Sequence, residues 1–301
     1  MMKQIGFVGL GAMGFGMASN LLAKGWPLTV WARSNQDAVH KLVEAGARQA
    51  ATPRTLAETC DIVIVCVTGS PQVEAVIKGP DGLAAAGKSL IIIDCSTSNP
   101  ASTMELAAEL SALGIVLVDA PLARTPKEAM EGKLDVMAGG AREHFEQARP
   151  VLEAFAARVI HTGPVGSGHT MKLLNNFLSM GYSAIYSEAL SLAVKAGLTP
   201  AVFNSVITGS RMDCGFYQAF IDFVINRNEN AQRFAIVNAL KDMTYLASFA
   251  QSVGVANPVG AVVRNGFATA VATGHGEKFV PALSDIVAGL NGVSLNEVAA
   301  E

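Results

Sequence analysis

The sequence of 301 residues lacks long hydrophobic runs and any excess of one charge. Its apolar stretches, such as 62–67 and 90–93, have the length of strands and fall far short of the roughly 20 residues that span a bilayer. The formal net charge is −3 and no Lys/Arg-rich run occurs, so nothing indicates binding to nucleic acid or to a membrane. We therefore expect a small anionic substrate and further copies of the same chain as partners.

Spacings typical of metal sites and redox motifs are also absent. The cysteines Cys60, Cys66, Cys95 and Cys214 form no CxxC pair, and we expect them to be buried and reduced. The five histidines form no HxxH or HxxxH pair, so we predict no metal site. The first residues place glycines within an apolar run and show no small-residue cleavage site, which predicts a cytoplasmic protein without a signal peptide.

The pattern of the chain changes near Gly163, and its length favours two domains. In residues 1–163, short β-branched runs alternate with helical stretches, which is typical of parallel strands joined by crossover helices. These runs are Gln4 to Val8, Leu28 to Ala32, Ile62 to Val67, Leu90 to Asp94, Val116 to Val118 and Asp135 to Ala138. We predict an α/β fold with a doubly wound, Rossmann-type parallel sheet.

Long helical patterns replace the strand-like runs in residues 164–301. The first, at 172–197, exceeds an average helix and is apolar around much of its circumference, so we expect a buried helix that links the domains. Further helices are predicted at 200–208, 216–225, 236–253 and 258–273. We predict an all-α C-terminal domain that helps to bind the substrate and forms a homodimer or homotetramer.

A glycine-rich motif follows the first predicted strand and opens a helical pattern. In this context, GxGxxG binds a dinucleotide: its glycines allow a tight turn, close approach of the pyrophosphate and close packing of helix on strand. Free N–H groups at the start of the helix face the phosphates. The expected cofactor-binding residues are Gly9, Leu10, Gly11, Ala12, Met13 and Gly14.

The second predicted strand ends without the acidic residue that usually binds the ribose 2′-hydroxyl of NAD. Arg33 and Ser34 follow it and offer a cation and a hydroxyl that suit a 2′-phosphate. We therefore predict that NADP is preferred over NAD. An ordinary exposed arginine is the alternative interpretation.

Polar residues also follow two further predicted strands. Val67 and Thr68 follow one, and Ser96 and Thr97 follow the next. Sheets of this kind bind ligands beyond the carboxyl ends of their strands, so we expect these residues near the ligands. Ser, Thr and Asn are also common in turns and helix caps, which is the structural alternative.

The long predicted helix carries polar side chains on an otherwise apolar face. Lys172 and Asn176 lie four residues apart on one face, with Asn175 beside them. Such groups need partners, and a ligand oxygen would serve. A snorkelling or ion-paired lysine is the alternative, and Lys241 in a later helix allows the same two interpretations.

Together these motifs resemble the β-hydroxyacid dehydrogenase family, which includes 3-hydroxyisobutyrate dehydrogenases and tartronate semialdehyde and glyoxylate reductases. The resemblance covers nearly the whole chain and rests on GxGxMGxxMAxNLxxxG (9–25), DCSTSNP (94–100), VDAP (118–121), GPVGSGHTMKLLNN (163–176) and LKDMTYLA (240–247). It implies that Lys172 is the general acid/base and that Asn176 orients the substrate. It also implies that Ser96 and Thr97 lie near the nicotinamide and the substrate, and that Lys241 approaches the cofactor.

One segment departs from the family pattern. Members usually continue DAP with a Ser-Gly-Gly segment that holds the substrate carboxylate, whereas residues 122–125 of this chain are Leu-Ala-Arg-Thr. A guanidinium is a planar set of donors matched to carboxylate, sulfonate or phosphate, so we predict that Arg124 and Thr125 bind the substrate anion. An ion pair of Arg124 with Glu128 or Glu131 is the alternative. The Arg-Thr pair resembles that of sulfolactaldehyde reductases, although those enzymes resemble NAD users.

We therefore predict an oxidoreductase that transfers hydride between NADP, or NAD, and a short-chain β-hydroxy acid or its aldehyde. The alternatives are a reductase of a sulfonated aldehyde and a sensor that binds the cofactor without catalysis. The resemblance assigns imine reductases another residue at the position of Lys172, and 6-phosphogluconate dehydrogenases a larger helical domain. Lys172, Asn176 and Ser96 occur together, which favours an enzyme over a sensor.

Overall fold

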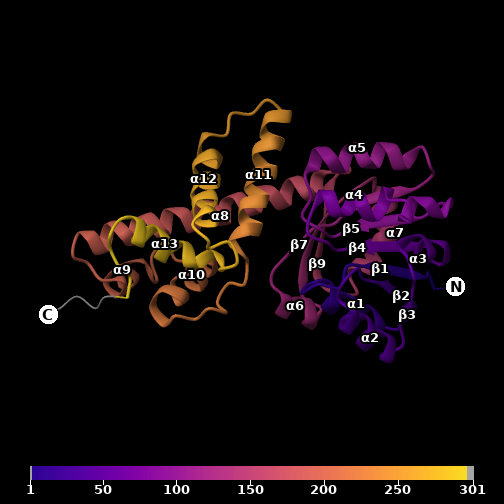
Figure 1. Cartoon of the computed structure of the whole chain (residues 1–301), viewed down its shortest axis with the longest axis horizontal. Coiled ribbons are helices and arrows are strands. Elements are labelled where there is room, and N and C mark those ends of the chain that lie inside the picture. The colour runs from indigo at the N-terminus through magenta and orange to yellow at the C-terminus, as the bar shows by residue number, and fades with distance from the viewer. Residues whose placement is uncertain (1, 297–301) are drawn as a thin grey trace. The chain divides into compact units, whose positions relative to one another are not determined.

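A computed structural model describes residues 2–296. The chain divides into two compact units, Met1–Lys172 and Leu173–Glu301 (Figure 1). The first unit contains the whole sheet, and the second consists of helices. Among the described residues, no helix has both the length and the hydropathy needed to cross a membrane.

The first unit is built on a sheet with a parallel centre. Its parallel strands lie in the order β3-β2-β1-β4-β5-β6, and the crossovers between them contain helices. The strands are β1 (Ile5–Val8), β2 (Leu28–Trp31), β3 (Arg48–Gln49), β4 (Ile62–Val65), β5 (Ile91–Asp94) and β6 (Val116–Asp119). The order reverses between β1 and β4, which is where such sheets bind dinucleotides.

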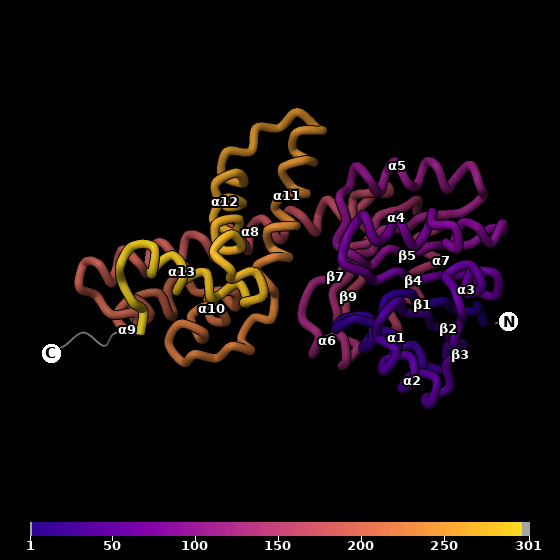
Figure 2. The backbone as a smooth tube through the Cα atoms, in the orientation of Figure 1, coloured from indigo at the N-terminus to yellow at the C-terminus, as the bar shows by residue number. Residues whose placement is uncertain are grey.

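The central strands are buried on both faces because alternate residues enter two different cores. Ile62 and Ile64 of β4 pack in one hydrophobic cluster, and Val63 and Val65 pack in the other. The first cluster is covered by α1 (Gly14–Ala23), α2 (Gln36–Glu44), α6 (Pro126–Glu131) and α7 (Arg142–Leu152). The second is covered by α3 (Pro53–Thr59), α4 (Ser70–Lys78), η1 (Leu83–Ala86) and α5 (Pro100–Ser111). Figure 2 shows α4 and α5 above the strands and α1 and α2 below them. The predicted doubly wound sheet is confirmed.

The last three strands depart from the parallel pattern. They are β7 (Leu122–Ala123), β8 (Leu134–Gly139) and β9 (Ala156–Gly163). β8 runs antiparallel to β6, with Asp119 opposite Gly139, so the expected parallel strand at 135–138 forms in the opposite direction. β6 pairs with the end of β8 and β7 pairs with its beginning, so β7 lies beyond the carboxyl end of β6. β9 lies parallel to β8. The sequence patterns did not indicate β3, β7 or β9, because the first two have only two residues and β9 is largely solvent-facing.

The second unit is organised around α8 (Ser167–Lys195), which begins in the first unit, five residues before the predicted start at 172. One core forms between α8, α11 (Ile236–Ser252), α12 (Pro258–Ala272), η2 (Val280–Ala282) and α13 (Leu283–Leu290). A second core joins α8 to α9 (Pro200–Ile207) and α10 (Gly215–Asn226). The predicted helices all form, and the short α13 was not predicted.

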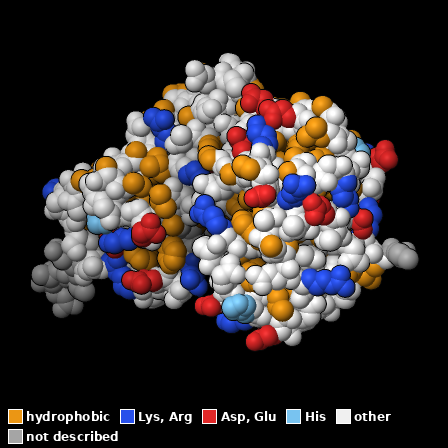
Figure 3. Space-filling view, turned by 45° about the vertical axis from the view of Figure 1, so that its right-hand side comes forward, with side chains coloured by type: hydrophobic (Ala, Val, Ile, Leu, Met, Phe, Trp, Pro, Cys, Tyr) orange, Lys and Arg blue, Asp and Glu red, His pale blue; other side chains and the backbone are white. Residues whose placement is uncertain are grey.

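Only one side of α8 is buried in the single chain, which corrects the expectation of burial around the helix. Ser183 and Ser187 are fully buried, and their hydroxyls donate to the carbonyl oxygens of Ser179 and Ser183 in the preceding turn. The opposite side carries large apolar side chains that are 40–70% exposed, namely Leu174, Leu178, Tyr182, Ile185 and Leu192. Figure 3 shows apolar side chains at the surface, interspersed with charged ones.

The cysteines are all free but differ in environment. Cys60 and Cys95 are buried and Cys66 is partly buried, whereas Cys214 is exposed just before α10, which corrects the expectation of burial for this thiol. Burial raises the pKa of Cys66 to about 12 and also raises the pKa of Cys95. These two thiols are therefore protonated at neutral pH and behave as small apolar side chains.

Candidate active site at the carboxyl edge of the sheet

The glycine-rich turn between β1 and α1 has the geometry that a dinucleotide requires. Gly9 has a φ of +96°, and a Cβ there would overlap the carbonyl oxygen of Cys66. A Cβ at Gly14 would overlap the carbonyl oxygen of Gly9. Apart from Gly11 itself and its chain neighbours, no atom lies within 4 Å of the Cβ position of Gly11, so a ligand can approach its backbone. The three glycines thus have the separate roles that the motif requires.

The start of α1 also fits a pyrophosphate. Met13 occupies the N-cap position and no side chain caps the helix, so the first N–H groups are not used by a capping side chain. The helix dipole adds a partial positive charge at this end. Leu10, Ala12 and Met13 lie in this turn between the end of β1 and the helix.

Arg33 and Ser34 lie after β2, beside the glycine-rich turn, and both are exposed. Asn35 connects the two segments, because its Nδ2 donates to the carbonyl of Leu10 at 2.7 Å while its Oδ1 accepts from the Ala38 N–H and caps α2. Asn35 was not among the predicted site residues, although an asparagine just before a helix is a common cap. The arginine that we expect to bind a 2′-phosphate is thus held next to the phosphate-binding turn.

The segments after β4 and β5 meet at the same edge. Ser96 is buried, and its Oγ accepts a hydrogen bond from the main-chain N–H of Val67 at 3.0 Å. A hydroxyl that accepts from the backbone retains its own proton for donation. Thr97 is partly buried and Thr68 is exposed. The structure therefore brings together the two segments that the sequence placed at the ligand-binding edge.

Two buried carboxylates lie at the ends of β5 and β6, and the second of them holds the start of α8. Asp94 accepts from the N–H of Ser96 at 2.9 Å, and Asp119 accepts from the N–H groups of Gly166 and His169 at 2.7 and 2.8 Å. Asp119 therefore caps the helix that carries Lys172. These aspartates and His169 were not among the predicted site residues, although an acidic residue at the end of an apolar strand is a visible signal.

Lys172 and Asn176 follow on the next turns of α8. Lys172 is partly buried, Asn175 is exposed and Asn176 is buried. The Nδ2 of Asn176 donates to Asp242 Oδ2 at 2.6 Å, and its Oδ1 accepts from Asn175 Nδ2 at 3.4 Å. The orientation of the Asn176 amide is thus fixed within the second unit.

Asp242 also pairs with the second predicted lysine. The Nζ of Lys241 lies 3.1 Å from Asp242 Oδ1 and 5.3 Å from the centre of the Tyr245 ring. Asp242 is almost fully buried, so this contact and the bond from Asn176 stabilise a carboxylate that would otherwise be costly to bury. Lys241 and Asn176 were predicted site residues, whereas the carboxylate of Asp242 that joins them was not predicted.

Arg124 lies in the segment between β7 and α6 and has a left-handed backbone. Its φ is +83°, a region in which arginine is rare and glycine is favoured. The Nε donates to Asp135 Oδ2 at 3.0 Å, while 46% of the side chain remains exposed. Arg158 approaches the other oxygen of Asp135 at 3.9 Å. The described ion pair is thus with Asp135, and the expected alternative partners Glu128 and Glu131 do not form it.

Thr125 caps α6. Its hydroxyl donates to Glu128 Oε2 at 2.5 Å and accepts from the N–H of Lys127 at 3.3 Å. The main-chain N–H of Thr125 also donates to Glu128 Oε2, at 3.0 Å, as part of a capping box. The hydrogen bond from Thr125 lowers the pKa of Glu128. In this structure the described contacts of Thr125 therefore belong to the helix cap, and its predicted contact with the substrate stays a prediction.

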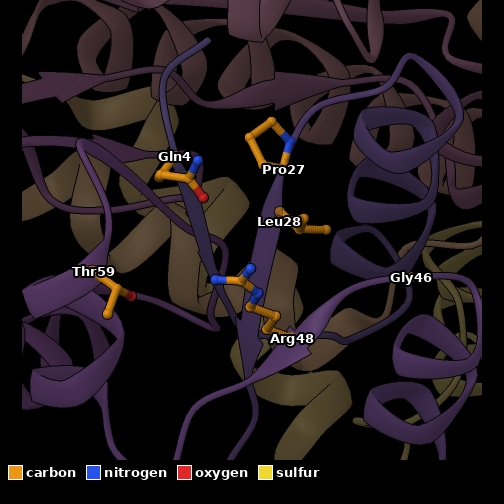
Figure 4. A pocket seen from close by; sticks show the side chains of 6 residues that line it. All are labelled: Gln4, Pro27, Leu28, Gly46, Arg48 and Thr59. Atoms are coloured by element: carbon orange, nitrogen blue, oxygen red, sulfur yellow. The ribbon is translucent and has the colours of Figure 1, made fainter. Parts of the chain in front are cut away.

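Two surface hollows of the first unit lie at the opposite, amino-terminal edge of the sheet. One, of about 330 Å³, is lined by residues next to the starts of β1, β2 and β3, and Figure 4 shows Gln4, Leu28 and Arg48 around it. The other, of about 570 Å³, lies next to the starts of β4, β5 and β6. Parallel sheets bind ligands at the carboxyl edge, so we assign neither hollow to catalysis. Within residues 2–296, no three metal-binding side chains converge.

Comparisons with known proteins agree with this arrangement. Residues 4–163 match the model of the NAD binding domain of 6-phosphogluconate dehydrogenase, and residues 166–284 match a model described as NAD-binding of NADP-dependent 3-hydroxyisobutyrate dehydrogenase. The chain is 33% identical over 278 residues to the 3-sulfolactaldehyde reductase of Escherichia coli, covering 92% of this chain and 93% of the relative. The chain belongs to the β-hydroxyacid dehydrogenase family.

Other relatives support the same family membership. The 3-hydroxyisobutyrate dehydrogenase of Pseudomonas aeruginosa is 36% identical over 274 residues, covering 88% of this chain and 91% of the relative. A solved 3-hydroxyisobutyrate dehydrogenase from Salmonella typhimurium has a TM-score of 0.82 at 30% identity and covers 94% and 99% of the two chains. Like its β-hydroxyacid dehydrogenase relatives, this chain is an NAD(P)-dependent oxidoreductase that acts on CH–OH groups, which confirms the predicted family, enzyme class and cofactor.

Proposed function

We propose that the enzyme interconverts a short-chain β-hydroxy acid and its aldehyde acid, and that it prefers NADP to NAD. In this proposal Lys172 is the general acid/base, Asn176 orients the substrate and Arg124 binds the substrate anion. The observation that carries the proposal is the conformation of Arg124, a cationic residue held in a backbone region that favours glycine.

The position of Arg124 supports a role in binding. A non-glycine residue in the left-handed region costs about 1–3 kcal/mol, and such strain persists mainly at functional sites. The Nε of the guanidinium bonds to Asp135, which fixes the plane of the group. The partly exposed side chain can then offer its remaining N–H groups to a carboxylate or a sulfonate in a bidentate pair.

Lys172 suits the proton transfer that accompanies reduction of an aldehyde. The bound dinucleotide supplies hydride in that direction, and the new alkoxide oxygen needs a proton. The ammonium form of a lysine can donate this proton directly. Asp119 fixes the first turn of α8, so the lysine extends from a rigid helix. Ser96 retains a hydroxyl proton that can be donated to a ligand oxygen.

The environment of Arg33 supports the preference for NADP. Both Arg33 and Ser34 are exposed, and Asn35 ties their segment to the carbonyl of Leu10 in the phosphate-binding turn. A guanidinium at this position can pair with a 2′-phosphate, whereas NAD offers only a hydroxyl.

A sulfonated aldehyde is the second candidate substrate. Arg124 provides a cation where a Ser-Gly-Gly segment would provide only neutral donors, and a sulfonate offers three oxygens to it. The similarity to the 3-sulfolactaldehyde reductase of Escherichia coli favours the same candidate.

A panel of short aldehydes tests the proposal. Matched aldehydes that end in a carboxylate, a sulfonate or a neutral hydroxyl should be assayed with each cofactor by nicotinamide absorbance. We expect turnover with an anionic aldehyde, weak turnover with the neutral one and higher kcat/KM with NADP. Cofactor binding without turnover on any aldehyde would instead support the alternative of a non-catalytic sensor.

Assembly into a homodimer or homotetramer is part of this proposal. The exposed side of α8 carries a row of large apolar residues, and Glu188 is the sole charged residue in 173–194. Such a face can meet its own copy without like-charge repulsion, which fits the symmetric interfaces of homo-oligomers. A monomeric mass in solution, measured by light scattering, would contradict this part.

A further inference from the structure

A histidine at the start of α8 connects three elements of the first unit. His169 is fully buried, and its Nδ1 lies 2.8 Å from Thr103 Oγ1 on α5. Its Nε2 lies 3.1 Å from the main-chain oxygen of Ser96, and its main-chain N–H donates to Asp119 at the end of β6. A histidine that merely filled space in a core would not need partners on three elements.

The partners determine how the ring is used. The carbonyl oxygen of Ser96 can only accept, so Nε2 carries a proton and donates it. Nδ1 lies 2.8 Å from the Thr103 hydroxyl, which also lies 3.1 Å from the carbonyl oxygen of Asn99 and has one proton for these two contacts. The nearby charged groups are Asp94, 3.7 Å from Nε2, and Asp119, 3.9 Å from Nδ1. The ring therefore links the start of α8 directly to the segment after β5.

We propose that His169 is a positioning residue for the hydride-transfer reaction. Lys172 follows it by three residues and thus lies about one helical turn further along α8. Ser96, whose carbonyl the ring holds, accepts at its Oγ from the N–H of Val67. His169 thereby sets the relative positions of the proton donor and of two segments at the ligand-binding edge. This inference rests on the proposed roles of Lys172 and Ser96.

Two substitutions at this position separate positioning from packing. His169→Leu keeps the bulk and removes both ring hydrogen bonds, whereas His169→Gln retains one donor and one acceptor. We expect kcat of the leucine variant to fall about 10- to 100-fold, because small displacements of catalytic groups have effects of this size. The dissociation constant of the dinucleotide should change less than about twofold, since most of its binding energy comes from the glycine-rich turn. The glutamine variant should recover most of the lost kcat.

Hydrogen–deuterium exchange of the cofactor-free protein gives a second readout. Peptides covering 94–99 and 166–172 should exchange faster in His169→Leu, while a peptide covering β1 and the glycine-rich turn should not change. The matched control is His144→Gln, because His144 lies on α7 beside the hollow at the opposite edge. This control should leave kcat, cofactor binding and exchange unchanged.

Several results would overturn the inference. An unchanged kcat in His169→Leu would do so, as would equal losses in the leucine and glutamine variants or a loss of cofactor binding as large as the loss of kcat. If the leucine variant does not fold, Thr103→Val decides: a fall in kcat of about threefold supports positioning, and an unchanged kcat contradicts it. Should the unmodified protein turn over no aldehyde, the proposed function fails, while the exchange experiment still tests the link made by His169.

Discussion

The inner and outer parts of the carboxyl edge hold their polar side chains in different ways. In the inner part, Asp94, Asp119 and His169 are buried, and the side chain of each is hydrogen-bonded to a main-chain group. In the outer part, Arg33 and Arg124 are exposed, and the described partner of Arg124 is a carboxylate in a partly exposed ion pair. Buried networks fix geometry, whereas exposed cations can exchange their partners for a ligand. We infer that the inner part serves the reaction and the outer part serves recognition.

The largest expected effect concerns Lys172, which extends from the inner part. Lys172→Ala should lower kcat about 10²- to 10⁴-fold, the usual contribution of a general acid, and leave the dissociation constant of the dinucleotide nearly unchanged. Steady-state kinetics and fluorescence titration measure the two quantities. Lys195→Ala, at the exposed end of the same helix, is the matched control and should behave as the unmodified enzyme. If Lys172→Ala keeps substantial turnover, Lys172 is not the proton donor.

The next effect concerns Arg124 and should appear in KM. Arg124→Gly should raise KM for the anionic aldehyde about 10- to 100-fold, since a charged hydrogen-bonded contact is lost. The free energy of unfolding should not fall, because relief of about 1 kcal/mol of backbone strain offsets a partly exposed ion pair worth about 0–1 kcal/mol. Steady-state kinetics measure KM, and urea denaturation measures the free energy of unfolding. Arg142→Ala on α7 is the control, and a KM unaffected by Arg124→Gly would show that the arginine does not bind the substrate.

Arg33 should have a smaller effect that depends on the cofactor. Arg33→Ala is expected to raise KM for NADP about tenfold and to change KM for NAD less than about twofold, because only NADP carries the 2′-phosphate. Arg48→Ala at the opposite edge is the control. Equal changes for both cofactors, or a higher kcat/KM with NAD in the unmodified enzyme, would exclude the assigned preference.

The smallest effect concerns the cap of α6 next to Arg124. Thr125→Ala should lower the free energy of unfolding by about 1 kcal/mol at neutral pH, whereas Thr125→Ser should retain the cap. The hydrogen bond from Thr125 lowers the pKa of Glu128 below its ordinary 4.5, so its contribution is present above that pH and is lost as the pH falls through the lowered value. Urea denaturation should therefore show that Thr125→Ala loses less free energy of unfolding, relative to the unmodified enzyme, at about pH 3 than at neutral pH. If the loss of free energy of unfolding in Thr125→Ala is the same at both pH values, the carboxylate of Glu128 does not contribute to the cap.

The sequence predicted the centre of the fold well because periodic patterns report burial. Strands such as β4 are continuously apolar and enter two cores, so Ile62 to Val67 was recognisable. The direction of β8 was not predictable, since an apolar run reads the same in a parallel or an antiparallel pair. The solvent-facing β9 gave no such pattern, because residues such as Arg158 and His161 interrupt it.

The candidate site was predictable where a motif has its own chemistry. The separate roles of Gly9, Gly11 and Gly14 follow from the motif and agree with the space around each glycine. Partners distant in sequence were not predictable, which is why the carboxylate of Asp242 beside Asn176 and the carbonyl of Ser96 beside His169 were missed. Such contacts depend on how the elements pack, and a single sequence does not record that.

The placement of β7 has a consequence for how new specificities can arise. This strand lies beyond the end of β6 and is joined to the sheet through two residue pairs with β8, Leu122 with Val136 and Ala123 with Asp135. Leu122 packs in the first core, whereas residues 123–125 lie outside both cores. Exchange of residues 123–125 therefore leaves the nucleotide-binding strands and their two cores intact, so the proposed head-group specificity can change without redesign of the scaffold.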